Sequence, residues 1–156
     1  MSQVLARKAV TDAAVAALIT TGFPIGDAAP PELPDTGQHA GWNGQPDADG
    51  SFFVPYAVLV PATITQTSGP LSDPQADVRV PYQLSIFGIN RGQVEDLADR
   101  CRQSLLPLRK QVLDLAGVNH KVQQVEFTSV GGIGRVDAAN PPTFGEVDTI
   151  TIWLTK

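Results

Sequence analysis

The chain has 156 residues, a formal net charge of -5 at pH 7, and 42% hydrophobic and 17% charged residues. This length suits one domain with a single core, and the composition is that of a folded globular protein rather than a disordered one. The acidic balance argues against direct DNA binding, because DNA-binding proteins carry basic stripes and the densest basic run here is only Leu108-Arg109-Lys110.

One cysteine, Cys101, excludes an intrachain disulfide, so the fold does not require an oxidising compartment. At the N-terminus, Arg7 and Lys8 precede an alanine-rich stretch, as in a signal peptide, but Thr11 and Asp12 interrupt the apolar region. No stretch approaches the length of a membrane helix. We therefore expect a soluble chain in the cytosol.

The first predicted element is a helix over residues Ser2 to Thr21. Alanine is the best helix former, and Gly22 followed by Pro24 supplies a stop. Six small or apolar residues recur at helical spacing: Ala6, Val10, Ala13, Ala14, Ala17 and Leu18.

Residues 22–51 are rich in proline and glycine and show little periodicity, which predicts a long irregular loop. Phe23 and Trp42 are the large apolar groups that could anchor it. The run Asp47-Ala48-Asp49-Gly50 resembles the start of a calcium loop, but the twelfth position is Val58 where that loop needs a glutamate. An exposed turn is the better interpretation.

Two strands are predicted next, at residues Phe53 to Gln66 and Ala76 to Gly88, joined by a turn at 67–75. Their spacing indicates an antiparallel hairpin. Pro55 and Pro61 lack an amide donor, which suits an edge or bulged strand.

A strand-to-helix junction follows at Gly88, and the helix after it is the best specified element in the chain. Asn90 can cap this helix, and Gln93 stands three residues further on, close to a capping box. One face of the helix is apolar, with Val94, Leu97, Ala98, Cys101 and Leu105.

Pro107 disrupts the end of this helix, and the pattern predicts a further helical turn or two at Leu108 to Leu115. After Gly117 we expect a strand near Lys121 to Val130, a loop at 131–145, and a last strand from Glu146 to Thr155. In that strand Ile150, Ile152 and Leu154 share one face, with Thr149, Thr151 and Trp153 opposite.

These elements predict one domain, 1–156, of the α+β class. A mainly antiparallel four-stranded sheet is covered on one face by helices, in the order α-β-β-α-β-β.

For each residue pattern that could support catalysis or ligand binding, a purely structural explanation is the better one. The glycines at 131–134 are followed by Arg135 and no helix, which favours a hairpin loop over a phosphate loop. His39 and His120 have no metal-ligand spacing, and Cys101 lies on an apolar helix face. Ser85 and Ser104 lack a nucleophile-elbow context. Asp96 and Asp99, a helical turn apart, fit a solvated first turn.

The segment from Val54 to Leu106 resembles the tail terminator proteins of long-tailed (siphovirus-type) bacteriophages, and is closest to versions from phages of actinobacteria. A strand ending PYAVLV is followed by the turn GPLSDP, the strand DVRVPYQLSIFG and the helix NRGQVEDLADRCRQSLL. The N-terminal helix and the two C-terminal strands extend the resemblance over essentially the whole chain. The sequence departs from the family in its residues 24–50 and at Pro107 to Leu115.

The resemblance implies a structural protein without catalysis, cofactor or metal. Family members form a hexameric ring on the head-proximal end of the tail tube, stop tube polymerisation and meet the head-completion proteins. DNA would pass through such a ring without specific binding. The resemblance thus places the chain in the virion tail, at the head–tail junction, and in the host cytoplasm during assembly.

Two other virion roles stay open: a head–tail connector or stopper, and a tail tube subunit. A small soluble enzyme or ligand-binding module, with its site in residues 24–50, is the alternative from another class.

The candidate interface residues lie in the two loops that join the expected strands. Hairpin ends are well placed to reach a neighbouring copy or the adjacent tube layer. We name Leu71 and Asp73 in the loop at 67–75, and Arg135 and Asp137 in the loop at 131–145.

Overall fold

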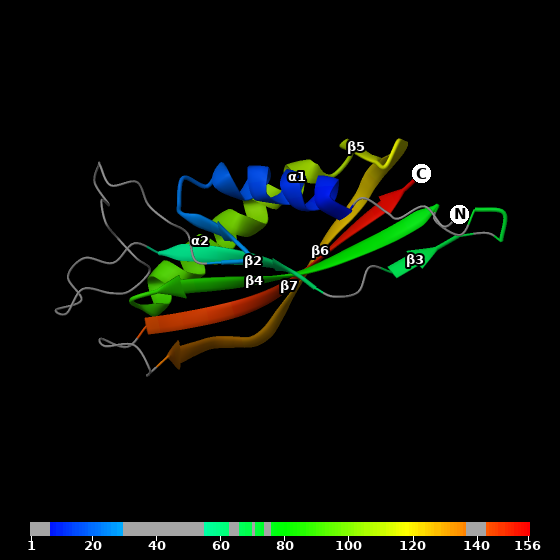
Figure 1. Cartoon of the computed structure of the whole chain (residues 1–156). Coiled ribbons are helices and arrows are strands. Elements are labelled where there is room, and N and C mark those ends of the chain that lie inside the picture. The colour runs from blue at the N-terminus through cyan, green and yellow to red at the C-terminus, as the bar shows by residue number, and fades with distance from the viewer. Residues whose placement is uncertain (1–6, 30–54, 63–65, 70, 74–75, 137–142) are drawn as a thin grey trace.

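A computed structural model describes residues 7–29, 55–62, 66–69, 71–73, 76–136 and 143–156 (Figure 1). In these residues two α-helices and a short 3-10 helix pack against a curled sheet of seven strands. No described helix is long and apolar enough to cross a membrane. The elements, in chain order, are α1 (Arg7–Ile19), β1 (Ile25–Asp27), β2 (Tyr56–Pro61), β3 (Gln66–Ser68), β4 (Asp77–Gly88), α2 (Arg91–Leu105), η1 (Leu106–Leu108), β5 (Val112–Leu115), β6 (Val118–Val136) and β7 (Thr143–Thr155).

The α+β class is confirmed, but the expected four-stranded sheet and the order α-β-β-α-β-β are wrong. The strands lie in the order β1-β2-β4-β7-β6-β5, and β3 also pairs with β4. The pair β1–β2 is parallel, so the sheet is mixed, and every other pair is antiparallel. The expected hairpin is present, because β4 pairs antiparallel with both β2 and β3. Strand β2 covers most of the described part of the strand expected at 53–66, whereas β3 takes only its last residue, Gln66, and extends into the turn expected at 67–75.

Strand β1 lies inside the segment expected to be an irregular loop, 22–51. It is only three residues long, and its partner in β2 is Ala57–Leu59. The backbone contact continues past the strand, since the amide of Ala28 donates to the carbonyl of Leu59 at 2.8 Å. Pairing with β2 thus makes a strand of Ile25–Asp27, a segment too short to show a periodic pattern in the sequence. Residues 30–54, the rest of the expected loop, lie outside the described part.

Strand β5 replaces the second half of the helical extension expected at 108–115. Only η1, which contains Pro107, is helical. A tight turn follows β5, with Ala116 at φ 55° and Gly117 at φ 86°, and positive φ at both central residues is what a two-residue hairpin turn requires. The Asp114 carboxylate accepts from the Gly117 amide at 2.6 Å and fixes this turn. The turn makes Leu115 and Val118 partners and so defines the hairpin.

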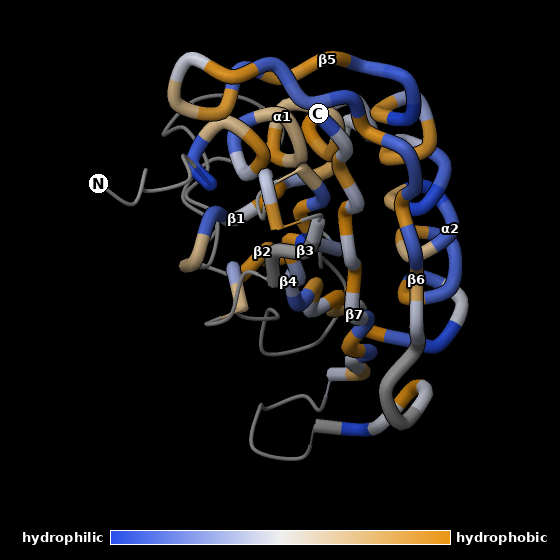
Figure 2. The backbone as a smooth tube through the Cα atoms, turned by 90° about the vertical axis from the view of Figure 1, so that its right-hand side faces the viewer, coloured by the Kyte–Doolittle hydropathy of each residue, from blue (hydrophilic) through white to orange (hydrophobic). Residues whose placement is uncertain are grey.

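Helix α1 packs between the two edge strands of the curled sheet, β1 and β5, and contacts both of them (Figure 2). Its buried residues are Val10, Ala14 and Leu18, and the alanine permits close approach. The Thr11 hydroxyl lies 2.9 Å from the Tyr82 hydroxyl of β4, which ties the helix to the middle of the sheet. Gly22, at φ 81°, ends the segment as the sequence predicted.

The core lies between the helices and one face of the sheet, as expected. Alternate residues of β4, from Val78 to Ile86, are buried against it, and so are Ile150, Ile152 and Leu154 of β7. The face of α2 predicted to be apolar is the buried one, with Val94, Leu97, Ala98, Cys101 and Leu105 all at 1% exposure or less. The opposite face of the sheet carries no described helix.

Candidate functional site

Two described residues of types that often carry chemistry, Cys101 and His120, are buried in the fold. Cys101 is fully buried, and burial raises the pKa of its thiol to about 12, which makes it a small core residue rather than a nucleophile. His120 is also buried, with Nδ1 3.2 Å from the Val118 carbonyl oxygen. Within the described residues no group of three His, Cys, Asp or Glu side chains could hold a metal ion. His39 and the run 47–50 lie outside those residues.

The structure separates the candidate interface residues into two groups. Leu71 and Asp73 lie between β3 and β4, at one end of the sheet, and Arg135 lies near the end of β6, opposite Phe144 of β7, at the other. Strand β4, which spans most of that distance, has 12 residues, so the two groups are separated by roughly 40 Å. Asp137 lies outside the described residues.

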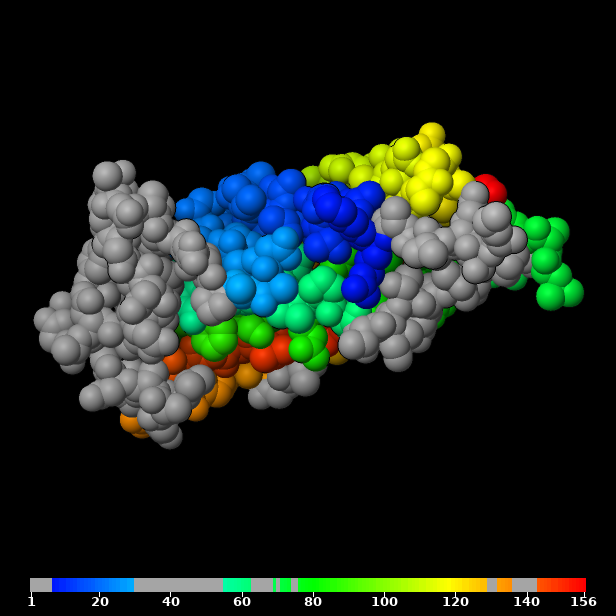
Figure 3. Space-filling view, viewed as in Figure 1, coloured from blue at the N-terminus to red at the C-terminus, as the bar shows by residue number. Residues whose placement is uncertain are grey.

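The turn that carries Leu71 is anchored at its base. Lys156 Nζ donates to the Asp73 carboxylate at 2.8 Å, and the Lys156 amide donates to the Ala76 carbonyl at 2.7 Å. The chain also passes close to itself, because a Cβ on Gly69 would clash with the Asp73 carbonyl oxygen. Leu71 nevertheless stays fully exposed. In the space-filling view this turn projects beyond the body of the molecule at the right-hand end (Figure 3).

The loop expected at 131–145 is largely strand, so that part of the expectation is wrong. Strand β6 continues to Val136 and β7 begins at Thr143. The glycine cluster forms an irregularity within β6, because the register moves from Val130↔Val147 to Gly134↔Gly145, with two more residues on the β6 side. Gly132, at φ 67°, takes the conformation that this irregularity requires. Glycines therefore mark a bulge here and not the start of a loop.

The strand-to-helix junction is closely packed. A Cβ on Gly88 would lie 2.9 Å from Cβ of Gln93 and 3.1 Å from Cγ2 of Val94, so only glycine fits against the first turn of α2. The Asn90 side chain accepts from the Gln93 amide at 2.9 Å, which confirms the predicted cap. The Gln93 side chain accepts from the Ile89 amide at 2.9 Å, one residue before the cap that a capping box would use. Together these contacts fix the angle between β4 and α2.

A buried charge cluster between α2 and β7 was missed by the sequence reasoning. Arg102 Nη2 donates to Oδ2 of Asp148 at 2.9 Å and to Oε1 of Glu146 at 3.3 Å. Its Nη1 donates to the exposed Asp99 at 3.2 Å. The side chains of Asp148 and Glu146 are only 1% and 9% exposed. One arginine thus joins the outer face of α2 to two carboxylates on the core face of the sheet.

Burial dominates the electrostatics of this cluster. It raises the pKa of Asp148, while Arg102 acts in the opposite direction and the neighbouring Glu146 raises the pKa further. Oδ1 of Asp148 is buried from solvent and has no hydrogen-bond partner among the described residues. Arg102 is shared between two carboxylates, so it only partly offsets the effect of burial on Asp148.

A signal for this cluster was present in the sequence. The sequence predicts that Ile150, Ile152 and Leu154 share one face of the last strand. The same two-residue period, extended backwards, puts Asp148 and Glu146 on that face, which is the buried one in the structure. Two carboxylates on a core face require a cation from the covering element, and Arg102 lies in the last turn of α2. The side chains face the helix and not solvent, so this cluster is suited to holding α2 in place.

The face of the sheet that no described helix covers carries a small cavity at the end nearest the Leu71 turn. Arg79 of β4 and Gln124 of β6 flank Trp153 of β7 in register, and the Arg79 guanidinium lies 3.6 Å from the centroid of the indole ring. A bulge between Val122 and Gln124 adds Gln123 to the rim. The resulting cavity has a volume of about 210 Å³. Nε1 of Trp153 is buried from solvent and has no hydrogen-bond partner among the described residues.

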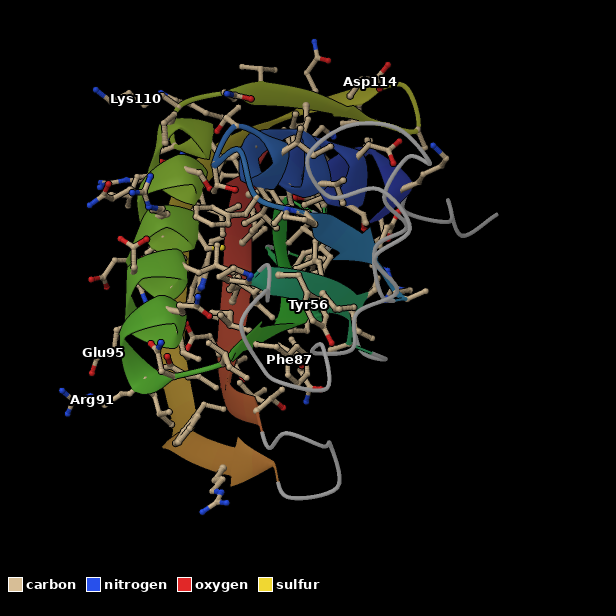
Figure 4. The ribbon with its side chains drawn as sticks, turned by 90° about the vertical axis from the view of Figure 1, so that its left-hand side faces the viewer. Tyr56, Phe87, Arg91, Glu95, Lys110 and Asp114 are labelled. Carbon is tan, nitrogen blue, oxygen red and sulfur yellow. The ribbon has the colours of Figure 1, made fainter. Side chains whose placement is uncertain are left out.

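A second aromatic feature lies at the other end of the same face. The rings of Tyr56 and Phe87 stack with centroids 4.9 Å apart, and Val58 and Ile89 belong to the same apolar cluster (Figure 4). Arg91 and Glu95, by contrast, lie on the outer side of α2, with 3.6 Å between Arg91 Nε and Glu95 Oε1. The face of the sheet that no described helix covers therefore carries aromatic groups at both of its ends.

Comparison with known proteins adds no functional assignment. No protein-family model matches the chain, and no curated protein matches it. One solved structure, whose name conveys no function, is similar over 96% of this chain and 88% of its own, with 16% identity and a TM-score of 0.41. A similarity of that strength carries no argument about function.

Proposed function

We propose that this chain is a tail terminator of a long-tailed phage. It is a structural virion protein that forms a hexameric ring on the head-proximal end of the tail tube. The ring stops tube polymerisation and joins the tail to the head-completion protein at the head–tail junction. The chain catalyses no reaction and needs no cofactor, and it meets its partners in the host cytoplasm during assembly.

The observation that carries the proposal is the placement of hairpin ends at the two opposite ends of one curled sheet. The turn with Leu71 and Asp73 lies at one end, and the β6–β7 tip with Arg135 lies at the other (Figure 1). A ring between a tube and a head-side protein must present two different axial surfaces. A single domain with projecting ends in opposite directions meets this requirement without a second domain.

The rigidity of the junction also supports a geometric role. Gly88 lets α2 approach the sheet closely, and Arg102 bonds the last turn of α2 to β7. A helix held at both ends keeps one orientation in every copy. Copies of uniform shape are what a ring of fixed curvature requires.

The charge of the chain is compatible with a conduit for DNA. A net charge of -5 gives no attraction for phosphates over the molecule as a whole. DNA then passes the ring without being held.

Purification of the chain alone tests this function against its alternatives. We expect monomers or discrete rings by light scattering and electron microscopy, and rings bound to one end only of preformed tail tubes. Filaments of indefinite length would identify a tube subunit, and twelve-fold rings that bind portal would identify a connector. A small molecule that copurifies at one equivalent would instead support a ligand-binding module.

A further inference from the structure

We infer that Asp148 and Glu146 hold one proton between them at neutral pH, so that Arg102 faces a single negative charge on β7 instead of two. The proton makes the contact between β7 and α2 a pH-sensitive clamp on the last turn of that helix. All the groups involved lie within one copy of the chain, so the clamp does not depend on the proposed assembly.

The two carboxyl groups, called the carboxyl pair below, converge on one point. They lie two residues apart on β7, so both side chains leave the strand on its buried face. The same nitrogen, Nη2 of Arg102, donates to Oδ2 of Asp148 at 2.9 Å and to Oε1 of Glu146 at 3.3 Å. The two groups are also in hydrogen-bond contact with each other. Two ionised carboxylates have no donor for such a contact, so it requires a proton on one of them.

Burial makes the doubly ionised state of the pair costly. The side chains of Asp148 and Glu146 are 1% and 9% exposed, so water screens their mutual repulsion only weakly. Arg102 carries one positive charge, and its Nη1 already donates to Asp99. A second negative charge on β7 would therefore lie in the fold without a full countercharge. One shared proton removes that charge, as in other pairs of adjacent carboxyl groups.

The strands beside β7 do not change this balance. On β4 the residues opposite the carboxyl pair are apolar, Leu84 and Ile86. On β6 the charged residue nearest in register is Arg135, which lies opposite Phe144 and is exposed, so solvent screens it. The titratable groups that α2 places around the pair are Arg102, Asp99 and Cys101.

Asp148 is the member of the pair that holds the proton. It is the more deeply buried of the two, and its Oδ1 receives no hydrogen bond from any described donor. A carboxylate oxygen in that position is unfavourable when the group is ionised. Burial raises the pKa of Asp148 and Glu146 raises it further, whereas Arg102 acts in the opposite direction.

Loss of this proton should loosen one end of α2. When Asp148 ionises, a second negative charge appears beside Glu146, and Arg102 in the last turn of the helix is the group that must balance both. The first turn is held differently, by close packing against Gly88 and by the Asn90 cap, which contain no titratable group. A rise in pH therefore acts on the last turn and leaves the first unchanged.

Infrared spectroscopy of the full chain in heavy water detects the proton directly, because a protonated carboxyl group absorbs at a higher frequency than a carboxylate. We expect such a band in the wild type at neutral pH, and its loss at higher pH. Labelling with ¹³C-aspartate should shift the band, and labelling with ¹³C-glutamate should not. Asp148→Asn should lack the band. Asp99→Asn, which removes an exposed carboxylate bonded to the same arginine, is the matched control and should keep it.

The spectra decide whether the proton is present and where it lies. A wild-type spectrum without the band at neutral pH would show that both groups are ionised, and would overturn the inference. A band that moves with labelled glutamate and not with labelled aspartate would overturn the assignment of the proton to Asp148. Labelled wild-type protein gives these results even if a variant folds poorly.

Hydrogen exchange over a range of pH tests the clamp. In the wild type, protection factors of amides in the last turn of α2 should fall over the pH range in which the infrared band is lost, while those of the first turn stay constant. Asp148→Asn keeps a neutral group beside Glu146, so its last turn should remain protected throughout. A wild-type last turn that is equally protected before and after loss of the band would rule out the clamp.

Discussion

At the scale of single residues, the Arg102–Glu146–Asp148 cluster links protonation to folding. Asp148 has a pKa raised chiefly by burial, so its folded pKa lies above its unfolded value. Such a group contributes stability that is fully present below the unfolded pKa and is lost as pH rises through the folded pKa. Asp148 therefore favours the folded state most strongly below its unfolded pKa, about 4, and less as pH rises above it.

We expect Asp148→Asn to remove this dependence. The amide keeps an oxygen for Arg102 but does not ionise, so the free energy of unfolding of the variant should lose the Asp148-dependent decrease as pH rises above about 4. Chemical denaturation at several pH values measures it. Asp99→Asn is the control, since Asp99 also bonds Arg102 but is exposed, and it should keep the wild-type profile. Identical pH profiles for Asp148→Asn and wild type would refute the assignment.

Two glycines at the strand-to-helix junction should respond to alanine in opposite directions. At Gly88 the new Cβ meets backbone and side-chain atoms of α2 at 2.9–3.2 Å, so Gly88→Ala should destabilise the fold by about 1–3 kcal/mol. At Gly92 the nearest atom is the Asn90 Oδ1 at 3.4 Å, and helix propensity favours alanine by about 0.5–1 kcal/mol. Denaturant titration of both variants measures these effects, and a stable Gly88→Ala variant would contradict the close-packing account.

At the scale of elements, α2 shows what sequence can specify. Its cap, its apolar face and its length follow from local residues, so all three were predictable. Strand β4 and the core face of β7 were predictable for the same reason, because the two-residue period is long and regular there.

The elements that sequence did not predict depend on partners far along the chain. β1 has three residues and exists through its pairing with β2, and β5 has four and exists through its hairpin with β6. Segments this short carry too little periodicity to distinguish strand from loop or helical turn. The Arg102 cluster was missed because its arginine and carboxylates lie on separate elements, although β7 alone signalled buried charge.

The assignment of the α2 face gives a prediction for the element as a whole. Leu97 is fully buried, so Leu97→Asp would put an unpaired carboxylate into the core at a cost on the order of several kcal/mol. Asp96→Ala, on the opposite face, loses only an exposed pair with Arg100 at 2.9 Å and should change stability by less than about 1 kcal/mol. Thermal melting compares them, and equal melting temperatures for wild type and Leu97→Asp would refute the assigned face.

At the scale of the whole molecule, the described helices lie on one side of the sheet. They close one of its faces, and no described helix covers the other (Figures 1 and 2). The two candidate interface groups do not form one site, because they lie at opposite ends of the sheet. Separation of this kind suits a ring with different neighbours above and below.

The central claim is that this chain ends the growth of a tail tube, and the tail-length distribution in its absence tests that claim most directly. Particles from a phage that lacks the chain should show, by electron microscopy, full heads separated from tails and tails of abnormally extended length. Restoring wild-type protein should restore one length and joined particles. Tails of normal length, firmly joined to heads without the chain, would contradict the account.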